Sequence, residues 1–274
     1  MKSSAVIRVI IWSVVAIILA WVLCWGLWLH GGGSLLGNKK TGASSEAKSS
    51  GNVISSSESF EGQKINKVKV EWVAGSIQVE SGDAVSFEVN EPENLKDEQR
   101  MSYKIDGDTL IIQEYSQSWN FSLGFNLNTI NNYASKNLKL VIPAGLEELK
   151  IETVSADVDL RAGIVVEELE VEAVSADINV DEISARKIEF ETVSGDMTVS
   201  LAKAAKKIKG NTVSGELTVY VSEDIGFTAE TESVSGDTNV NMSVTNHNDK
   251  IIHGDGDMEI ELNSVSGDMN IYKK

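Results

Sequence analysis

The 274-residue chain has little of the residues on which several protein classes depend. Its single cysteine, Cys24, excludes a disulfide framework and a thiolate metal site. Only 2 prolines stand against 22 glycines, which excludes collagen-like and proline-rich disordered chains. Basic residues number 24 against 41 acidic ones, and the resulting net charge of −17 makes nucleic acid a poor partner.

One long apolar run lies near the N-terminus. Residues 9–29 carry no charge, and a helix of that length spans about 30 Å, the thickness of a bilayer's hydrocarbon core. Because Lys2 and Arg8 precede the run, we expect a single-pass membrane helix with a cytoplasmic N-terminus, in a tail-and-anchor segment of residues 1–30. A cleaved signal peptide is the alternative, but no small-x-small cleavage site precedes the glycines at 31–33.

Residues 31–59 are rich in glycine and serine and poor in apolar side chains. Such a segment cannot bury enough surface to offset the entropy lost on ordering, so we expect a flexible linker. A random coil of this length reaches about 30 Å. The rest of the chain would then lie outside the cell membrane, as a β-rich part at 60–145 and a repeat region at 146–274.

A short motif recurs through the repeat region. The dipeptide Val-Ser begins at 154, 174, 193, 213, 234 and 265, so successive copies are 20, 19, 20, 21 and 31 residues apart. A fixed period of this kind is typical of a solenoid. The sequence VAGS at 73–76 is a diverged copy, which suggests that the repeat begins before the regular run.

The residues around each motif alternate between apolar and polar, as in Leu149, Ile151, Val158 and Leu160. This alternation predicts strands with one buried face. Ile151 and Val158 are an odd number of positions apart, so the chain must bend between them. Alanine or glycine lies at the expected bend, at 156, 176, 195, 215, 236 and 267. The pattern leaves open whether Val154 or Ser155 faces the core. We therefore predict an all-β fold, a parallel β-helix with coils of about 20 residues.

Three segments carry a resemblance to a known family: DGDTLII at 106–112, LKLVIPAG at 138–145, and LEELKIETVSADVDL at 146–160 with its later copies. They resemble a family of bacterial cell-envelope proteins described as putative adhesins, a β-helical domain of unknown function. The resemblance extends over residues 60–274. It implies a location in the cell envelope, and it brings no catalytic residues with it.

An acidic residue follows each small residue of the motif, and the stacked coils would align these acids in one column: Asp157, Asp177, Asp196, Glu216, Asp237 and Asp268. We expect them to accept hydrogen bonds from turn amides. The alternative is a divalent cation, calcium above all, bridging neighbouring carboxylates. Asp255 and Asp257 are further candidate ligands, but HGDGDMEIE at 253–261 lacks the glycine of an EF-hand loop, so a solvated loop is expected. His247 and His253 nearby are expected to be surface residues.

The chain as a whole suggests a membrane-anchored, extracytoplasmic binding or adhesion module without catalytic activity. Its partner would be a cell-envelope polymer or protein, and the last coil, ending at residues 271–274, could self-associate through unpaired backbone groups. One alternative is an accessory protein in envelope-stress sensing that acts through a membrane partner. Another is a β-helical enzyme that cleaves polysaccharides, which would need a cleft and a carboxylate pair or calcium-binding acids.

Overall fold

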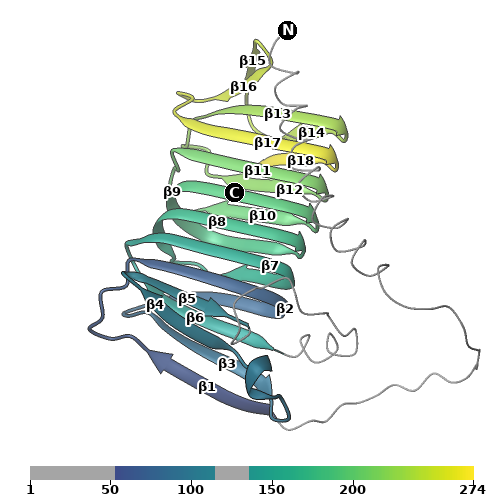
Figure 1. The fold of residues 1–274 in the computed structure, drawn as a ribbon. Coiled ribbons are helices and arrows are strands. Elements are labelled where there is room, and N and C mark those ends of the chain that lie inside the picture. The colour runs from purple at the N-terminus through teal and green to yellow at the C-terminus, as the bar shows by residue number, and fades with distance from the viewer. Residues whose placement is uncertain (1–52, 115–135) are drawn as a thin grey trace, which may run out of the picture. The chain divides into compact units, whose positions relative to one another are not determined.

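A computed structural model describes residues 53–114 and 136–274, which form one 18-stranded sheet (Figure 1). The all-β prediction is confirmed for this part of the chain. The expected membrane helix at 9–29 and most of the expected linker lie outside the described residues. Among the residues that are described, no helix is long and apolar enough to cross a membrane.

The elements before the regular repeat are β1 (Val53–Ser59), β2 (Lys67–Gly82), β3 (Ser86–Pro92), a 3-10 turn at Asp97–Gln99, β4 (Ser102–Asp106), β5 (Thr109–Gln113) and β6 (Asn137–Pro143). The repeat contains β7 (Leu146–Leu160), β8 (Val165–Ser175), β9 (Ile178–Ser194), β10 (Met197–Leu201), β11 (Lys207–Ser214), β12 (Leu217–Val221), β13 (Phe227–Ser235) and β14 (Thr238–Val240). The chain ends with β15 (Thr245–His247), β16 (Lys250–His253), β17 (Met258–Ser266) and β18 (Met269–Lys273).

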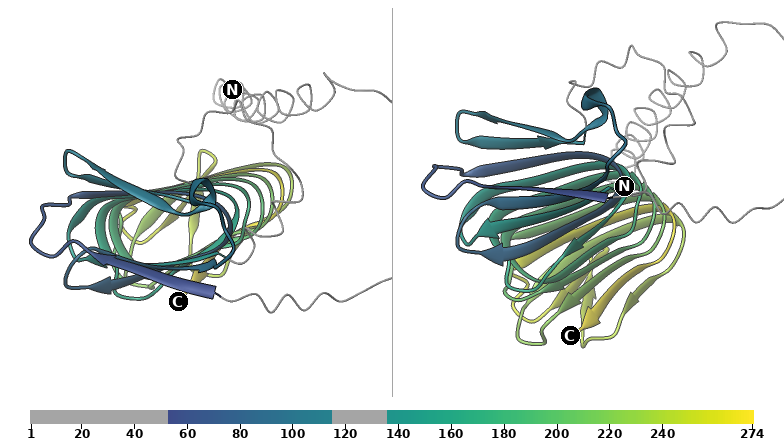
Figure 2. Two further views of the ribbon diagram at one scale, coloured as in Figure 1. Left: turned by 60° about the horizontal axis from the view of Figure 1, so that its bottom comes forward. Right: turned by 90° about the horizontal axis from the view of Figure 1, so that it is seen from below.

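Successive coils stack through parallel strand pairs, as the repeat predicts, and enclose a core between two walls (Figure 2). The first half of each coil builds one wall, through 67–72 of β2, 146–153 of β7, β8, 184–192 of β9, β11, β17 and β13. The second half builds the other wall, through 76–82 of β2, 158–160 of β7, 178–180 of β9, β10, β12, β18 and β14. The diverged VAGS copy belongs to the stack, since Gly75 of β2 lies opposite Ala156 of β7.

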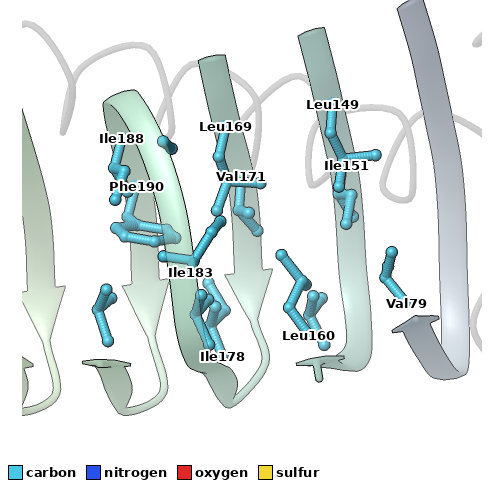
Figure 3. Close-up of a cluster of buried hydrophobic side chains, with 14 of the residues drawn as sticks. Val79, Leu149, Ile151, Leu160, Leu169, Val171, Ile178, Ile183, Ile188 and Phe190 are labelled. Atoms are coloured by element: carbon cyan, nitrogen blue, oxygen red, sulfur yellow. The ribbon is translucent and has the colours of Figure 1, made fainter. Parts of the chain in front are cut away.

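Apolar side chains from both walls fill the space between them. Leu149 and Ile151 of one coil contact the layer of Leu169 and Val171 from the next, and Phe190 continues the row (Figure 3). All five side chains are fully or almost fully buried. Since each such side chain contributes about 1.5–3 kcal/mol on burial, the core holds together coils that could not fold alone.

The bend between the two walls lies where the small residues predict it. In the first regular copy, Thr153 and Ala156 are buried, while Val154 is half-buried and Ser155 is exposed. Neither Val154 nor Ser155 therefore faces the core. The Thr153 hydroxyl accepts a hydrogen bond from the Ala156 amide at 2.9 Å, which supports the bend from within. We call this bend, repeated in every coil, the corner.

Glycine occupies the corner in the later coils because backbones approach one another closely there. Gly195, Gly215 and Gly267 have φ angles of 121°, 142° and 152°, a region that side-chain-bearing residues rarely adopt. A Cβ atom at Gly215 would lie 2.1 Å from the carbonyl oxygen of Gly195. A Cβ atom at Gly267 would lie 2.0 Å from that of Gly215. The column of glycines is therefore what allows these corners to stack.

The order of the coils in space differs from their order in the sequence. The last coil of the chain, β17–β18, lies between β11–β12 on one side and β13–β14 on the other (Figure 1). The prediction that residues 271–274 end the stack with unpaired backbone groups is therefore wrong, because β18 pairs with β12 and β14. The long 31-residue step explains the insertion. It contains the hairpin β15–β16, which runs antiparallel to β13 and returns the chain to the side of β11.

At the other end of the stack β5 and β6 add to β2 in parallel, and antiparallel strands then extend both walls (Figure 2). β5 and β4 continue the first wall from β2, and β6, β3 and β1 continue the second. The linker prediction is wrong for its last residues, since β1 occupies Val53–Ser59. This serine-rich strand buries no side chain, so its backbone pairing with β3 supplies the order that its composition does not.

Candidate binding surface

The acidic residues of the motif do align along the corner, and their carboxylates cap backbone amides. Oδ1 of Asp157 accepts a hydrogen bond from the Asp177 amide at 3.2 Å, and Oδ1 of Asp177 accepts one from the Asp196 amide at 3.0 Å. The Glu216 amide donates to Asp196 at 2.9 Å. In the inserted coil, Asp268 accepts from the Asp237 amide at 2.9 Å. These bonds confirm the expected capping role for Asp157, Asp177, Asp196 and Asp268, and each of them links two neighbouring coils. Glu216 instead accepts from the side chains of Thr218 and Asn270.

Asp255 and Asp257 lie in the turn between β16 and β17. The Asp257 amide donates to Oδ1 of Asp255 at 3.3 Å, a bond within the turn itself. Within residues 53–114 and 136–274, no group of three or more His, Cys, Asp or Glu side chains is arranged so that it could hold a metal ion. Calcium bridging along the corner stays a prediction that the structure does not support.

The outer surface of the first wall is a lattice of lysines and glutamates, and we call it the charged wall. Lys150 of β7 contacts Glu170 at 2.9 Å and Glu172 at 2.8 Å, both on β8. On the opposite side of β8, Lys187 of β9 contacts Glu168 of β8 at 2.5 Å. Although burial lowers the pKa of Lys150, its hydrogen bonds to Glu172 and Glu170 outweigh burial and raise that pKa above its ordinary value.

The lattice follows a simple rule. The coil with three outward glutamates, at 168, 170 and 172, lies between coils that supply lysines. The pattern recurs further along, where Lys207 contacts Glu259 and Glu261, each at 3.1 Å. A single exposed pair contributes less than about 1 kcal/mol. The main effect of the lattice is therefore to match each coil to a neighbour of complementary charge.

Towards β2 the second wall also carries ion pairs, such as Lys139 with Glu80. Along β10, β12, β18 and β14 its outer surface carries amides, hydroxyls and two tyrosines, and we call this part the polar wall. Pairing aligns five uncharged residues across successive coils: Asn179, Thr198, Thr218, Asn270 and Asn239. A second column aligns Tyr220 directly with Tyr272. The two rings have their centroids 6.0 Å apart and are tilted by 58°. The tyrosines with Thr218, Asn270 and Asn239 form what we call the tyrosine platform.

Hydrogen bonds fix the side chains of the platform. Nδ2 of Asn270 donates to Oε1 of Glu216 at 2.6 Å and to Oγ1 of Thr218 at 3.2 Å. Oδ1 of Asn270 accepts from Nδ2 of Asn239 at 2.9 Å and from the Tyr272 hydroxyl at 3.0 Å. Since Asn270 is buried within this network, its orientation is set before any ligand arrives.

The sequence itself carries a signal for the tyrosine platform. Tyr220 and Tyr272 each lie seven positions after the valine of their Val-Ser pair, at Val213 and Val265. In a strand that alternates inward and outward, equal offsets place two residues on the same face of adjacent coils. What the sequence could not show is that these two coils are neighbours, since another copy of the motif separates them in the chain.

His253 holds together the end of the stack at which the platform lies. It is buried, against the expectation of a surface residue, and its ring packs 5.4 Å from that of Phe227. Nδ1 lies 2.8 Å from the Ser243 carbonyl oxygen and Nε2 lies 2.9 Å from the Glu223 carbonyl oxygen. Carbonyl oxygens only accept hydrogen bonds, so both ring nitrogens must donate, which requires the protonated imidazolium. These bonds to the Glu223 and Ser243 carbonyls raise the pKa of His253, and the charges of Glu223 and Asp255 add to the effect.

We expect this end of the protein to lose stability as the pH rises. A histidine whose pKa is raised by folding contributes stability in full below its ordinary pKa of about 6.5, and that stability is lost as the pH rises through the folded value. The variant His253→Ala should therefore melt below the wild type at pH 6, with a loss on the order of 1 kcal/mol for the missing bonds. The difference between variant and wild type should shrink by pH 9, as measured by thermal denaturation.

His247→Ala is the matched control, because His247 is exposed on β15, the strand that forms the hairpin with β16 and its His253. It should melt like the wild type at every pH. An equal, pH-independent effect of the two substitutions would show that the two bonds of His253 do not depend on its charge.

Comparison with known proteins finds solved structures with a similar fold. A solved structure from Clostridium sporogenes, described as "a putative cell adhesion protein", is 18% identical and has a TM-score of 0.50, with 81% of this chain and all of that chain covered. A "putative adhesin" from Bacteroides fragilis is 13% identical with a TM-score of 0.41, covering 81% of this chain and 97% of that one. At these identities the likeness concerns the fold alone. Comparison with curated proteins finds no match.

A family model gives the more specific result. The model described as Toastrack DUF4097 matches the chain twice, at residues 65–200 and 147–272. The two matches overlap within the stack of coils and together include β2, both walls and the inserted coil. The predicted likeness to a family of adhesin-like proteins of unknown function is thereby confirmed, and the chain belongs to the Toastrack DUF4097 family.

Proposed function

We propose that this protein is a non-catalytic binding module of the bacterial cell envelope, and that the tyrosine platform binds an uncharged envelope polysaccharide. The observation that carries the proposal is the pairing of Tyr220 and Tyr272 beside a preorganised row of amides and hydroxyls. The similar structure described as a cell adhesion protein supports a binding role in general terms.

The chemistry of the platform matches a sugar polymer. A tyrosine ring offers an apolar face on which the C–H face of a sugar ring can stack, and its hydroxyl adds a polar contact. Amide and hydroxyl groups can both donate and accept hydrogen bonds, as sugar hydroxyls require. Coils stacked about 4.8 Å apart present these groups at regular intervals, which suits a repeating chain. The net charge of −17 opposes polyanions, so a neutral polymer is the expected ligand.

The proposal includes display on the outer side of the membrane. Its support is the uncharged run at residues 9–29 with Lys2 and Arg8 before it. The absence of a catalytic role is supported by the corner, where Asp157, Asp177 and Asp196 accept backbone hydrogen bonds. Carboxylates engaged in this way are poorly placed to act as an acid and base pair. Envelope-stress sensing through a membrane partner stays an alternative that depends on the membrane segment.

The decisive experiment measures retention of the purified full chain on insoluble envelope polysaccharides freed of protein. We expect the double variant Tyr220→Ala/Tyr272→Ala to bind at least about tenfold more weakly, because losing 1.4 kcal/mol of stacking corresponds to a factor of ten. Asn270→Ala should weaken binding as well, since it releases four hydrogen bonds at once.

Tyr103→Ala is the matched control, because Tyr103 is an exposed tyrosine on β4 at the other end of the stack. It should leave retention unchanged. Equal retention of the wild type and the double tyrosine variant would refute the platform as the binding surface. New reducing or unsaturated ends in the incubated polysaccharide would instead favour the enzymatic alternative.

A further inference from the structure

Glu216 departs from the capping role of the other corner acids. Four of those acids each accept a hydrogen bond from the backbone amide of a neighbouring coil: Asp157, Asp177, Asp196 and Asp268. In space β18 follows β12, so the amide that Glu216 would cap is that of Asp268. Within the described coils, Glu216 makes no such bond and is the only acid with a further coil stacked on it that leaves the next amide uncapped.

The carboxylate of Glu216 turns towards the tyrosine platform instead. Its Oε1 accepts from the Thr218 hydroxyl at 2.9 Å and from Nδ2 of Asn270 at 2.6 Å. Both donors are buried, whereas Glu216 itself is exposed. Each carboxylate oxygen has about two acceptor positions, so these two bonds occupy Oε1. The exposed Oε2 is therefore the oxygen that remains to accept hydrogen bonds from a ligand.

The length of the side chain accounts for this difference. The corner acid is aspartate in five copies of the motif and glutamate only at 216. The additional methylene carries the carboxylate past the corner and onto the outer surface of the polar wall. Glu216 also lies in a coil that bears a tyrosine, Tyr220, and adjoins the coil that bears Tyr272. The exchange of a cap for an outward carboxylate thus occurs beside the tyrosine platform.

Glu216 and Tyr220 mark the two ends of one outward row on β12. Residues 216, 218 and 220 share the outer face, while Leu217 and Val219 between them are buried in the core. At about 3.3 Å per residue, the two ends of the row are about 13 Å apart. A single sugar ring is too short to contact both ends, so a ligand that does so contains at least two linked sugars.

We propose that Glu216 is a specificity-determining residue of the tyrosine platform, and that its Oε2 accepts hydrogen bonds from the hydroxyls of one sugar while Tyr220 and Tyr272 stack on another. This inference rests on the proposed polysaccharide binding and narrows the ligand to a chain with free hydroxyl groups. Hydrogen bonds to an ionised acceptor are roughly twice as strong as those between neutral groups. The exposed carboxylate also disfavours anionic sugars, since like charges brought together oppose binding.

Glu216→Gln tests the proposal, because glutamine keeps the length of the side chain and an acceptor oxygen for Thr218 and Asn270 while it removes the charge. Retention of the full chain on the protein-free envelope polysaccharide should weaken about fivefold. The melting temperature should stay that of the wild type. After O-methylation of the polysaccharide, which removes hydroxyl donors and keeps the sugar rings, the wild type should lose its advantage over the variant.

The length of the ligand is tested by competition. A partial hydrolysate of the same polysaccharide, which contains short chains, should release the retained wild type. A complete hydrolysate of equal mass, which contains single sugars, should not.

Glu216→Asp separates binding from stability. An aspartate at this position can cap the Asp268 amide as the aspartates of the neighbouring corners cap theirs. We therefore expect this variant to melt at or above the temperature of the wild type and yet to be retained as weakly as Glu216→Gln. Asp157→Ala is the matched control, because Asp157 caps the Asp177 amide at the corner of β7, away from β12 and β18. It should melt below the wild type and be retained equally well.

Three results would overturn the proposal. The first is equal retention of the wild type and Glu216→Gln while Tyr220→Ala/Tyr272→Ala is lost, which would keep the tyrosines as the binding surface and remove Glu216 from it. The second is an undiminished advantage of the wild type on the methylated polysaccharide, and the third is equal competition by single sugars and short chains. Full retention of the double tyrosine variant would instead refute the proposed function, and the role of Glu216 with it.

Discussion

Gly215→Ala is expected to destabilise the protein by about 3 kcal/mol or more. The substitution adds a Cβ atom 2.1 Å from the Gly195 carbonyl oxygen, a backbone atom that cannot move without disturbing its own corner. It also forces alanine to a φ angle of 142°, in a region that only glycine adopts readily. Overpacking and backbone strain each cost about 1–3 kcal/mol. Urea denaturation followed by circular dichroism measures the loss.

The control Gly107→Ala separates the two causes. Gly107 also has a positive φ angle, of 65°, but a Cβ atom there would meet nothing within 4 Å. We expect a loss of about 1 kcal/mol from backbone strain alone. If the two variants lost equal stability, the close stacking of the corners would not be what requires glycine in the motif.

Removal of residues 257–274 is expected to disorder more than the coil that it deletes. The deletion removes the buried side chains of Met258, Ile260, Leu262, Met269 and Ile271, each contributing about 1.5–3 kcal/mol. Among the described strands, it also removes the only parallel partners of β13 and β14. Amide hydrogen exchange at residues 227–240 should therefore accelerate at least a hundredfold, although these residues precede the deletion.

The same experiment contains its internal reference. Strands β7 and β8 pair with β2, with each other and with β9, far from the deletion, and should keep their protection. Preserved protection at 227–240 would contradict the expectation. It would mean that β13–β14 can dock directly on β11–β12 when the inserted coil is absent.

The repeating part of the fold could be predicted because the residues of a single motif determine both its strands and its bend. Alternation around Ile151 and Val158 indicated strands, their odd spacing indicated a bend, and Ala156 marked where the bend lies. Each of these three features depends on neighbours within the same motif, so a single copy is sufficient to reveal it. The capping role of Asp157 needed the repeat as well, because its partner is the Asp177 amide of the next coil.

The order of the coils could not be predicted for the same reason. The copies at 234 and 265 share the sequence SVSGD, so either could stack on the copy at 213 without breaking the pattern. The hairpin β15–β16 determines which of the two copies stacks on the copy at 213. Its position depends on strand pairing that the motif does not encode. The tyrosine platform depends on this order, which is why the sequence indicated the tyrosines without indicating that they meet. β1 was missed because backbone pairing, and not composition, orders it.

The inserted coil also determines when the protein can finish folding during its synthesis. The ribosome makes β13–β14 before β17–β18, yet β13–β14 acquires its parallel partners only when β17–β18 has been made. Domains generally begin to fold from their N-terminal side as they emerge. A nascent chain that stops before Met258 therefore leaves β13–β14 incompletely docked, although the sequence of that coil has already been made.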